Sequence, residues 1–250
     1  IAMIGASARP GKLGHDILSN LVNAGFKGPI YPVNPKADSI LGLKVYKDVA
    51  SLPEPTDLAV IVIPSDMVAG ALGACGTNGI TSAVVVTGGF AEAGPEGEKL
   101  QQELVRVADI HNLRVVGPNC QGINNPHHGL CASWPLITTR GRIAFVSQSG
   151  TVGAALIDWA SQDHLGFSLF VSLGNRADVD ESDCITYLNA DPETKVIALY
   201  LEGVKKPASF IEALAKTTKP VVILKAGRTV RGRIAAESHT KSLAGDDSIY

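Results

Sequence analysis

Short apolar runs alternate with longer amphipathic stretches along the first half of the chain. The runs are rich in valine and isoleucine and show little polar alternation, as is typical of parallel strands covered on both faces. Between them, apolar residues recur at three- and four-residue spacing, which predicts amphipathic helices. We therefore expect strands at residues 2–4, 30–33, 58–63, 83–86 and 115–116, and helices at 12–24, 65–75 (with Ser65 as a cap) and 96–111.

A second series of the same kind begins after a loop that contains Pro126, two histidines and Gly129. It predicts strands at residues 143–146, 168–173, 196–201 and 221–224, and helices at 152–161, 182–189 and 208–216. Alternating strands and helices build a parallel sheet with helices on both faces, so we expect an α/β fold with two doubly wound domains. We place these domains at residues 1–130 and 140–250, and we interpret residues 228–250 as an extended loop.

The composition narrows the function classes. The 250 residues include 22 Lys and Arg against 24 Asp and Glu, a net charge of −2, so nucleic-acid binding is not expected. No apolar run is long enough to cross a bilayer and no signal peptide is recognisable, so we expect no membrane contact. The four cysteines, at positions 75, 120, 131 and 184, form no CxxC pair. We therefore expect no disulfide framework, no metal site and a cytoplasmic location.

A glycine-rich loop connects the first predicted strand to the first helix. Gly5, Ser7, Lys12 and Gly14 lie where backbone N–H groups at a helix start can bind a phosphate. The spacing does not fit a P-loop, because a leucine stands where a hydroxyl should bind magnesium, and it does not fit a G-x-G-x-x-G loop. A simple turn of the chain is the alternative interpretation.

The end of the second predicted strand indicates the kind of nucleotide. NAD enzymes usually have Asp or Glu there to hold a ribose diol, whereas this chain has Asn34 and Lys36. A lysine favours a phosphorylated ribose, which both NADP and coenzyme A (CoA) carry. Pro64, Gly88 and Phe90 follow the next two strands at the same edge of the sheet, although ordinary turns would also explain them.

A second strand-to-helix turn consists of small polar residues. It could bind one phosphoryl group at the start of a helix, or Ser149 or Thr151 could simply cap that helix. The residues of this turn are Ser147, Gln148, Ser149, Gly150 and Thr151.

Two further residues could take part in phosphoryl transfer. Glu202 follows the third strand of the second domain, where a carboxylate can act in a site, although a solvated loop residue would give the same pattern. His239 stands alone among small and polar residues, after a basic stretch at residues 219–233. A histidine on a polar loop can act as the nucleophile that accepts a phosphoryl group.

These motifs occur together and in order in one family. The chain resembles the NDP-forming acyl-CoA synthetases, which include the succinyl-CoA synthetase α subunit and the ADP-forming acetate–CoA ligases. The resemblance covers essentially all of the chain, and the acetate–CoA ligase branch is most similar in pattern. It rests on IGAS at residues 4–7, YPVNP at 31–35, GPNCQG at 117–122, VSQSG at 146–150, KAGR at 225–228 and SHT at 238–240.

The resemblance implies a Rossmann-like CoA-binding domain followed by a flavodoxin-like ligase domain that ends in a phosphohistidine loop. It also implies an ADP-forming reaction in which a carboxylate, CoA and ATP are interconverted with acyl-CoA, ADP and phosphate through an acyl phosphate. His239 would carry the phosphoryl group, Glu202 would orient His239, and the turn at residues 147–151 would bind the phosphate. The residues along CoA would be Gly5, Ser7, Lys12, Gly14, Asn34, Lys36, Pro64, Gly88, Phe90 and Asn119.

The resemblance also implies what the chain needs from elsewhere. ATP or ADP, with Mg²⁺, would bind to an ATP-grasp β subunit or fused domain, and a small carboxylic acid would be the remaining substrate. Cys120 would lie near the CoA thiol as a buried small residue and not as a nucleophile. Lys241 stands where the family commonly has glycine.

Two other functions stay open from the sequence. One is a CoA-sensing regulatory domain of a fused protein acetyltransferase, although such domains tend to lack the histidine. The other is an NADP-dependent oxidoreductase, which Lys36 would suit but which leaves the second domain and His239 unexplained.

Overall fold

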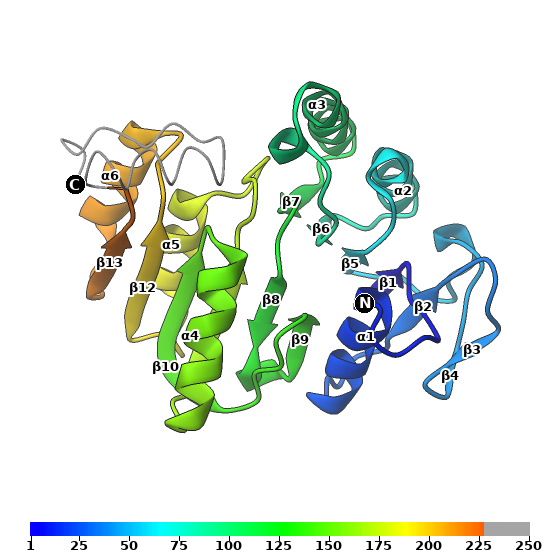
Figure 1. Ribbon diagram of the computed structural model, residues 1–250, viewed down its shortest axis with the longest axis horizontal. Helices are drawn as coiled ribbons and strands as arrows, with labels where there is room; N and C mark the ends of the chain where they lie inside the picture. The colour runs from blue at the N-terminus through cyan, green and yellow to red at the C-terminus, as the bar shows by residue number, and fades with distance from the viewer. Residues whose placement is uncertain (228–250) are drawn as a thin grey trace.

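The first sheet of the computed structural model, which describes residues 1–227, contains only parallel strands (Figure 1). In spatial order the strands are β2 (Tyr31–Val33), β1 (Ala2–Ile4), β5 (Leu58–Ile61), β6 (Ser82–Val85) and β7 (Arg114–Val116). The chain places β2 on one side of β1 and the later strands on the other. Because the connections that follow β1 and β5 run in opposite directions, they leave room for a ligand at the carboxyl ends of the strands.

Helices cover both faces of the first sheet. α2 (Ser65–Thr77) and α3 (Pro95–Ile110) lie on one face, and α1 (Leu13–Asn23) lies on the other. Neighbouring strand residues point to opposite faces, so Ile61 packs with α2 and α3 while Val60 packs with α1. Burial on both faces explains why the apolar runs in the sequence show no polar alternation.

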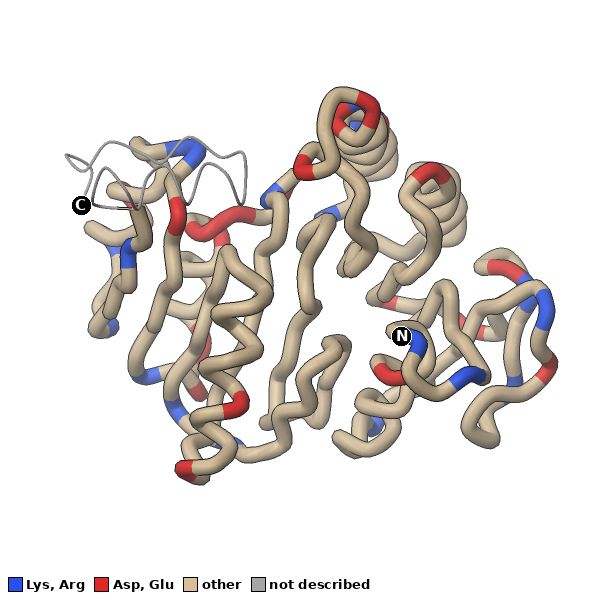
Figure 2. Tube along the Cα trace, in the orientation of Figure 1, with Lys and Arg blue, Asp and Glu red and all other residues tan. Residues whose placement is uncertain are grey.

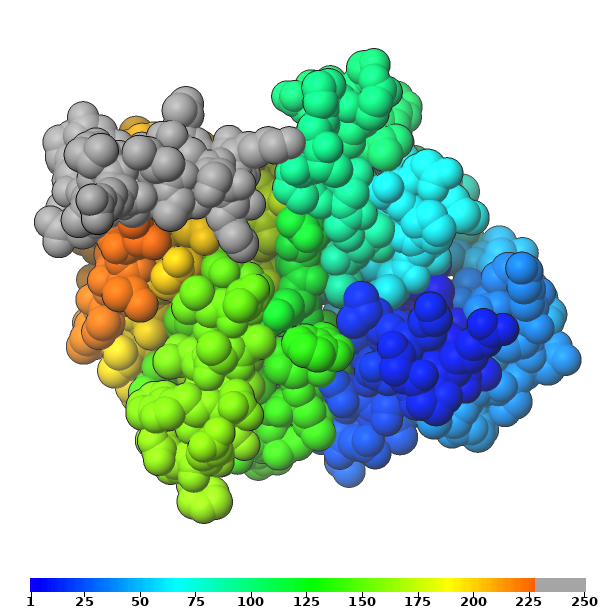
Figure 3. All heavy atoms as spheres, in the orientation of Figure 1, coloured from blue at the N-terminus to red at the C-terminus, as the bar shows by residue number. Residues whose placement is uncertain are grey.

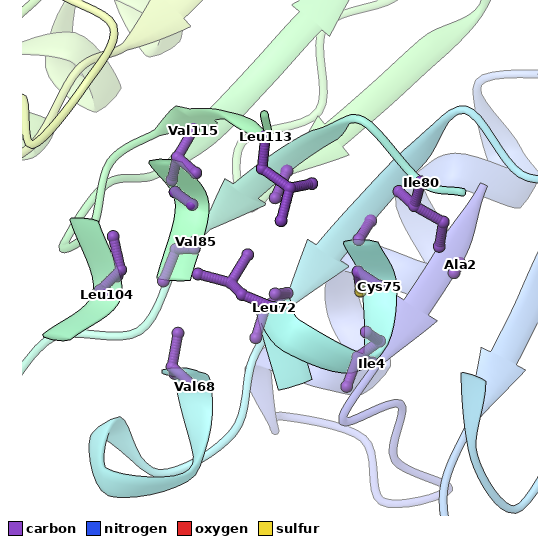
Figure 4. Close-up of a cluster of buried hydrophobic side chains, with 14 of the residues drawn as sticks. Ala2, Ile4, Val68, Leu72, Cys75, Ile80, Val85, Leu104, Leu113 and Val115 are labelled. Atoms are coloured by element: carbon purple, nitrogen blue, oxygen red, sulfur yellow. The ribbon is translucent and has the colours of Figure 1, made fainter. Parts of the chain in front are cut away.

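The apolar face of α2 shows how the helical spacing is used (Figure 4). Val68, Leu72 and Cys75 are 0% exposed and lie on one side of the helix, where they meet strand residues such as Val85 and Val115. Burying a side chain such as valine or leucine stabilises the fold by roughly 1.5–3 kcal/mol. The spacing of these residues therefore fixes which side of α2 faces the sheet.

The start of α2 differs from the sequence prediction. Pro64 occupies the N-cap position with extended backbone, and Ser65 is the first helical residue, without a capping hydrogen bond from a side chain. The prediction that Ser65 caps the helix was wrong because the proline ends the loop one residue earlier.

The second sheet combines four parallel strands with an antiparallel hairpin. α4 (Gly150–Gln162) covers one face, and α5 (Glu181–Ala190) and α6 (Pro207–Lys216) cover the other. The connections after β10 and β12 diverge, as they do after β1 and β5, so both domains are doubly wound α/β units, as the sequence predicted. In spatial order the strands are β13 (Val221–Lys225), β12 (Val196–Leu201), β10 (Arg140–Ser147), β11 (Phe167–Ser172), β8 (Gly122–Asn125) and β9 (Leu130–Ser133).

The segment predicted as a loop around Pro126 is this β-hairpin. β8 pairs with β11, and the 3-10 helix η3 (Pro126–His128) connects β8 to β9. The hairpin also packs on α1, because the side-chain amide of Asn20 donates to the carbonyl oxygens of Ser133 and Trp134 at 3.0 and 2.7 Å. In the space-filling view, this green part of the chain lies between the blue first unit and the yellow-green second unit (Figure 3).

A short ladder of backbone hydrogen bonds joins the two units at the loop after β11. The side chain of Asp178 adds to it, because its Oδ2 accepts from the backbone N–H of Val115 at 2.7 Å and from Nε of Arg114 at 3.0 Å. The carboxyl edges of the two sheets are thus held beside each other. The ladder runs from the N–H groups of Asn175, Ala177 and Val179 to the carbonyl oxygens of Pro118, Gly117 and Val115.

Three small elements complete the described part of the chain. A two-stranded hairpin of β3 (Ser39–Ile40) and β4 (Leu43–Lys44) and the 3-10 helix η1 (Val49–Ser51) follow β2, and the 3-10 helix η2 (Ala91–Ala93) precedes α3. Basic and acidic residues are interspersed over residues 1–227 (Figure 2). No helix within these residues is long and apolar enough to span a membrane.

A pair of glycine substitutions tests how closely the first loop and α1 approach each other. A Cβ at Gly14 would lie 2.0 Å from the carbonyl oxygen of Gly5, whereas a Cβ at Gly70, within α2, would meet nothing within 4 Å. We expect Gly14→Ala to lower the free energy of unfolding by about 1–3 kcal/mol. We expect Gly70→Ala to raise it by about 0.5–1 kcal/mol, because alanine favours the helix. Denaturant unfolding measures both, and equal effects would contradict the close approach.

Candidate active site between the two domains

A cavity of about 680 Å³ lies where the carboxyl edges of the two sheets meet. The first unit contributes Glu92, Asn119 and Gln121 to its lining, and the second contributes Ser149, Gly150 and Glu202. The cavity therefore brings the predicted CoA residue Asn119 together with the second phosphate-binding turn and Glu202, whereas no residue of the glycine-rich loop at 5–14 lines it.

The start of α4 forms one wall of the cavity. Ser149 is the N-cap, and its Oγ accepts from the backbone N–H of Val152 at 3.4 Å, so the capping interpretation of this serine is correct. Gly150 and the exposed Thr151 line the cavity beside the cap. Helix N–H groups at this end favour an anion, so capping does not exclude phosphate binding.

Ser147 is buried behind this wall, and Gln148, although only 6% exposed, lines the cavity. The Ser147 hydroxyl donates to the carbonyl oxygen of Ser149 at 2.7 Å and shapes the turn. The Gln148 Oε1 accepts from the backbone N–H groups of Glu202 and Gly203 at 2.7 and 3.2 Å, and its Nε2 donates to the Gly203 carbonyl oxygen at 2.8 Å. Gln148 thus fixes the loop after β12, and Glu202 with it, beside the start of α4.

A buried ion pair supports the same loop. Arg176 and Glu181 have side chains only 5% and 1% exposed, and Nη1 of Arg176 lies 3.3 Å from Oε2 of Glu181. The same Nη1 donates to the carbonyl oxygen of Gly203 at 2.7 Å, while the buried Nε of Arg176 has no protein partner. Arg176 also lines the cavity, so a positive charge lies next to Glu202.

Lys205 is a second cation at the cavity. Its ammonium donates to the carbonyl oxygens of Asn175 and Arg176 at 2.7 and 3.2 Å. Burial lowers the pKa of Lys205, and the nearby charge of Arg176 lowers it further. The lysine, the arginine and the start of α4 together make this side of the cavity suitable for an anion.

Glu92 lies on the opposite side, in the first unit. Its Oε1 accepts from the backbone N–H groups of Gly89 and Phe90 at 2.5 and 3.1 Å, and its Oε2 accepts from Nδ2 of Asn175 at 2.5 Å. Burial alone would raise the pKa of Glu92, but the hydrogen bonds from Asn175 and from the backbone outweigh it and hold the pKa below its usual value. Glu92 is therefore an ionised anchor between two loops and is poorly suited to act as a base.

The residues predicted to lie along CoA follow the spatial order of the first sheet. They occupy the loops at the carboxyl ends of neighbouring strands, and the row ends at the cavity, where Asn119 lies. In strand order they are Asn34 and Lys36 after β2, Gly5 and Ser7 after β1, Pro64 after β5, Gly88 after β6 and Asn119 after β7.

Local contacts hold this edge in place. Nδ2 of Asn34 donates to the Ala6 carbonyl oxygen at 2.7 Å and ties the loop after β2 to the loop after β1. Lys12, at the N-cap of α1, and Lys36 are exposed and can meet a phosphate. The side chain of Phe90 is 0% exposed in the core, so only its backbone can contribute to a site.

Comparisons with known proteins agree with this arrangement. A model of a CoA-binding domain matches residues 1–126, and a model of a succinyl-CoA ligase-like flavodoxin domain matches residues 140–250. The α subunit of an ADP-forming acetate–CoA ligase II from Pyrococcus furiosus is 44% identical in an alignment of 252 positions that covers all of this chain and 55% of that protein. An ADP-forming acetate–CoA ligase I from Archaeoglobus fulgidus is 45% identical over all of this chain and 37% of that protein.

The solved structures give the same result. A dinucleotide-forming acetyl-coenzyme A synthetase 1 from Candidatus Korarchaeum cryptofilum, in complex with phosphate and ADP, superposes with a TM-score of 0.95 at 44% identity, over all of this chain and 54% of that one. The chain belongs to the NDP-forming acyl-CoA synthetase superfamily. It spans about half the length of the Pyrococcus relative and less of the Archaeoglobus one.

For this superfamily member, sequence reasoning missed several residues of the cavity. Asp178 and Asp180 follow β11 but do not line the cavity, because Asp178 binds Arg114 across the joint and Asp180 caps α5. Their neighbours Asn175 and Arg176 line the cavity instead. The sequence feature that could have identified Asn175 and Arg176 is their position shortly after the end of a predicted strand.

Other parts of the predicted site lie outside the described residues, namely His239, Lys241 and the rest of residues 228–250. A larger groove of about 790 Å³ on another side of the molecule has a mainly apolar lining that includes Ile123 and Val171, and no predicted site residue lines it. Within residues 1–227, no group of three or more His, Cys, Asp or Glu side chains is arranged to hold a metal ion.

The reactivity of the four cysteines toward a thiol reagent tests how deeply they are buried. All four are buried, and burial raises the pKa of their thiols, to about 12 for Cys75 and Cys120. The Cys120 thiol also donates to the carbonyl oxygen of Val85 at 3.3 Å. Because a raised pKa keeps a thiol protonated at pH 8, we expect iodoacetamide to leave the native protein unlabelled and to label all four cysteines after unfolding.

A Ser39→Cys variant provides the positive control, because residue 39 is exposed and its thiol should react in the native state. Mass spectrometry locates the modified residues. Rapid native-state modification of Cys120 would show that it is a reactive thiol and not a buried packing residue.

Proposed function

We propose that this chain supplies the CoA-binding and phosphoryl-transfer parts of an ADP-forming acyl-CoA synthetase. The enzyme would interconvert a small carboxylic acid, CoA and ATP with acyl-CoA, ADP and phosphate. The observation that carries this proposal is the cavity in which the end of the CoA edge, at Asn119, faces the start of α4 and Glu202.

CoA would lie across the carboxyl edge of the first sheet. Its phosphorylated ribose would meet Lys36, its diphosphate would meet the loop from Gly5 to the start of α1, and its thiol end would reach Asn119. The order of these residues along neighbouring strands supports this direction, because an extended molecule can contact each loop in turn.

The chemistry would take place in the cavity. In the direction of ATP formation, a phosphate oxygen would attack the thioester carbonyl carbon, the C–S bond would break, and CoA would leave and take up a proton. The N–H groups at Gly150 and Thr151 and the guanidinium of Arg176 would bind the attacking phosphate, while new negative charge would develop on the thioester carbonyl oxygen. The start of α4 is already fixed by the cap of Ser149, and Arg176 is fixed by its contacts with Glu181 and the Gly203 carbonyl oxygen.

His239 would accept the phosphoryl group in the next step. An imidazole nitrogen would attack phosphorus and the carboxylate would leave, so that the histidine carries the phosphoryl group to ADP. Glu202 would orient the imidazole. ADP and Mg²⁺ would bind to an ATP-grasp module, as a partner subunit or as a fused segment.

The alternative functions have less support. The relatives named above are ligases and synthetases, and the second domain would have no task in an NADP-dependent oxidoreductase. A regulatory CoA sensor would need the CoA edge but not the row of cations and helix N–H groups beside Glu202.

Isotope labelling tests the proposed function. We expect the complete ligase, incubated with acetyl-CoA and radiolabelled phosphate, to become labelled at His239, because the phosphoryl group passes through the imidazole. His239→Ala should abolish the label, while His128→Ala, at an exposed histidine of η3, should keep it. A His239→Ala protein that still labels would reject the assignment.

Ligand-induced stabilisation tests the CoA edge separately. We expect CoA at about 100 times its Kd to stabilise the protein by about 2.7 kcal/mol, and NADPH to have no effect. Lys36→Ala should weaken CoA binding by about tenfold but leave the binding of 3′-dephospho-CoA unchanged, because the lysine pairs with the ribose phosphate. Lys47→Ala, which removes an exposed lysine paired with Asp38, is the matched control. Equal losses of affinity for CoA and 3′-dephospho-CoA would show that Lys36 does not pair with the ribose phosphate.

A further inference from the structure

We propose that Glu92 and Asn175 form a positioning pair that joins the CoA loop of the first domain to the phosphate loops of the second and is required for the step in which CoA reacts. This inference rests on the proposed function and assigns to the site two residues outside its CoA, phosphate and histidine groups. The pair spans the joint, because Glu92 belongs to η2 and Asn175 to the loop after β11.

Both oxygens of the Glu92 carboxylate accept hydrogen bonds. The carboxylate accepts from the N–H groups of Gly89 and Phe90, in the loop that follows β6, and from Nδ2 of Asn175. A Cβ at Gly88, one residue before that loop turn, would lie 3.3 Å from Oε1 of Glu92. The position of this carboxylate therefore sets the shape of the loop where the thiol end of CoA is expected.

Both ends of the Asn175 side-chain amide are hydrogen-bonded as well. Its Nδ2 donates to Glu92 and, at 2.8 Å, to Oε1 of Gln101, and its Oδ1 accepts from Nδ2 of Asn119 at 3.2 Å. All three partners belong to the first unit or to the segment that follows β7. The side chain of Asn175 therefore ties the loop after β11 to three side chains next to the CoA edge.

The backbone around Asn175 continues the connection into the second domain. A Cβ at Gly174 would lie 2.3 Å from the carbonyl oxygen of Pro118, so the loop after β11 lies directly against the segment after β7. The next residue, Arg176, donates to the Gly203 carbonyl oxygen beside Glu202. A continuous chain of contacts thus runs from the CoA loop through Glu92, Asn175 and Arg176 to the wall that faces phosphate.

This arrangement predicts which step depends on the pair. Loss of the Glu92–Asn175 bond would displace the CoA loop relative to the start of α4, and a displacement of about 1 Å can slow a reaction about 100-fold. Transfer of a phosphoryl group from ATP to His239 does not involve CoA, and the bonds of Ser149 and Gln148 that shape the phosphate wall would remain. The two half-reactions should therefore respond differently.

Exchanging the donor and the acceptor gives a sharp test. Asn175→Asp places a second carboxylate against Glu92, and Glu92→Gln replaces an acceptor oxygen by a donor that faces Nδ2 of Asn175. In the double variant, the amide at position 92 can donate to the carboxylate at position 175, so the bond is restored with its direction reversed. Glu96→Gln, at an exposed residue of α3 that pairs with Lys99, is the matched control.

We would measure three quantities on the complete ligase with its ATP-grasp part: the Kd for CoA, kcat/KM for CoA, and the labelling of His239 by radiolabelled ATP. We expect kcat/KM for CoA to fall about 100-fold in Asn175→Asp and about tenfold in Glu92→Gln, and to return to within about tenfold of the original in the double variant. Labelling by ATP should change less than about twofold in every variant.

Three results would overturn the inference: unchanged kcat/KM and Kd for CoA in Asn175→Asp, equal losses in both half-reactions, or no recovery in the double variant. A failure of the proposed function looks different, because then the unmodified ligase would not label His239 at all. The Kd for CoA would still decide whether the pair shapes the CoA loop in that case.

Discussion

The side-chain amide of Gln148 holds together the loops after β10 and β12, the two strands of the second sheet whose connections run in opposite directions. It is 6% exposed, it accepts from the backbone N–H groups of Glu202 and Gly203, and it donates to the carbonyl oxygen of Gly203. A buried amide with a single set of partners leaves the loops one arrangement, because any other would leave polar groups unpaired. The relative position of the α4 start and Glu202 therefore depends on the side chain of Gln148, which also lines the cavity.

The joint between the domains extends the same constraint. The backbone ladder between the loop after β11 and the segment after β7 brings the carboxyl edges of two separate sheets to one cavity. In a doubly wound fold each such edge is a ligand site on its own. Here the two edges share a wall, so a molecule bound along the first sheet ends where an anion would bind on the second.

The sequence predicts best those strands that helices cover on both faces. Apolar runs without polar alternation identified β1, β5, β6 and β12 because both faces of these strands are covered. The hairpin of β8 and β9 escaped prediction because Asn124 and Asn125 interrupt the apolar pattern and a histidine-containing turn separates the strands. Ser149, Gly150 and Glu202 could be predicted for the site because each directly follows a strand. Glu92 and Asn175 could not be predicted, because these two residues form a pair across 83 positions of the sequence.

The buried ion pair of Arg176 and Glu181 also holds the loop after β12 in position. A buried ion pair often stabilises a protein no more than apolar residues of the same volume would. Nη1 of Arg176, however, also donates to the Gly203 carbonyl oxygen, and a methionine in its place would leave the Glu181 carboxylate buried with only the amide of Gln148 as a side-chain donor. The guanidinium is thus required by the carbonyl and the carboxylate around it. Because it also lines the cavity beside Glu202, the group that fixes the loop supplies positive charge where an anion would bind.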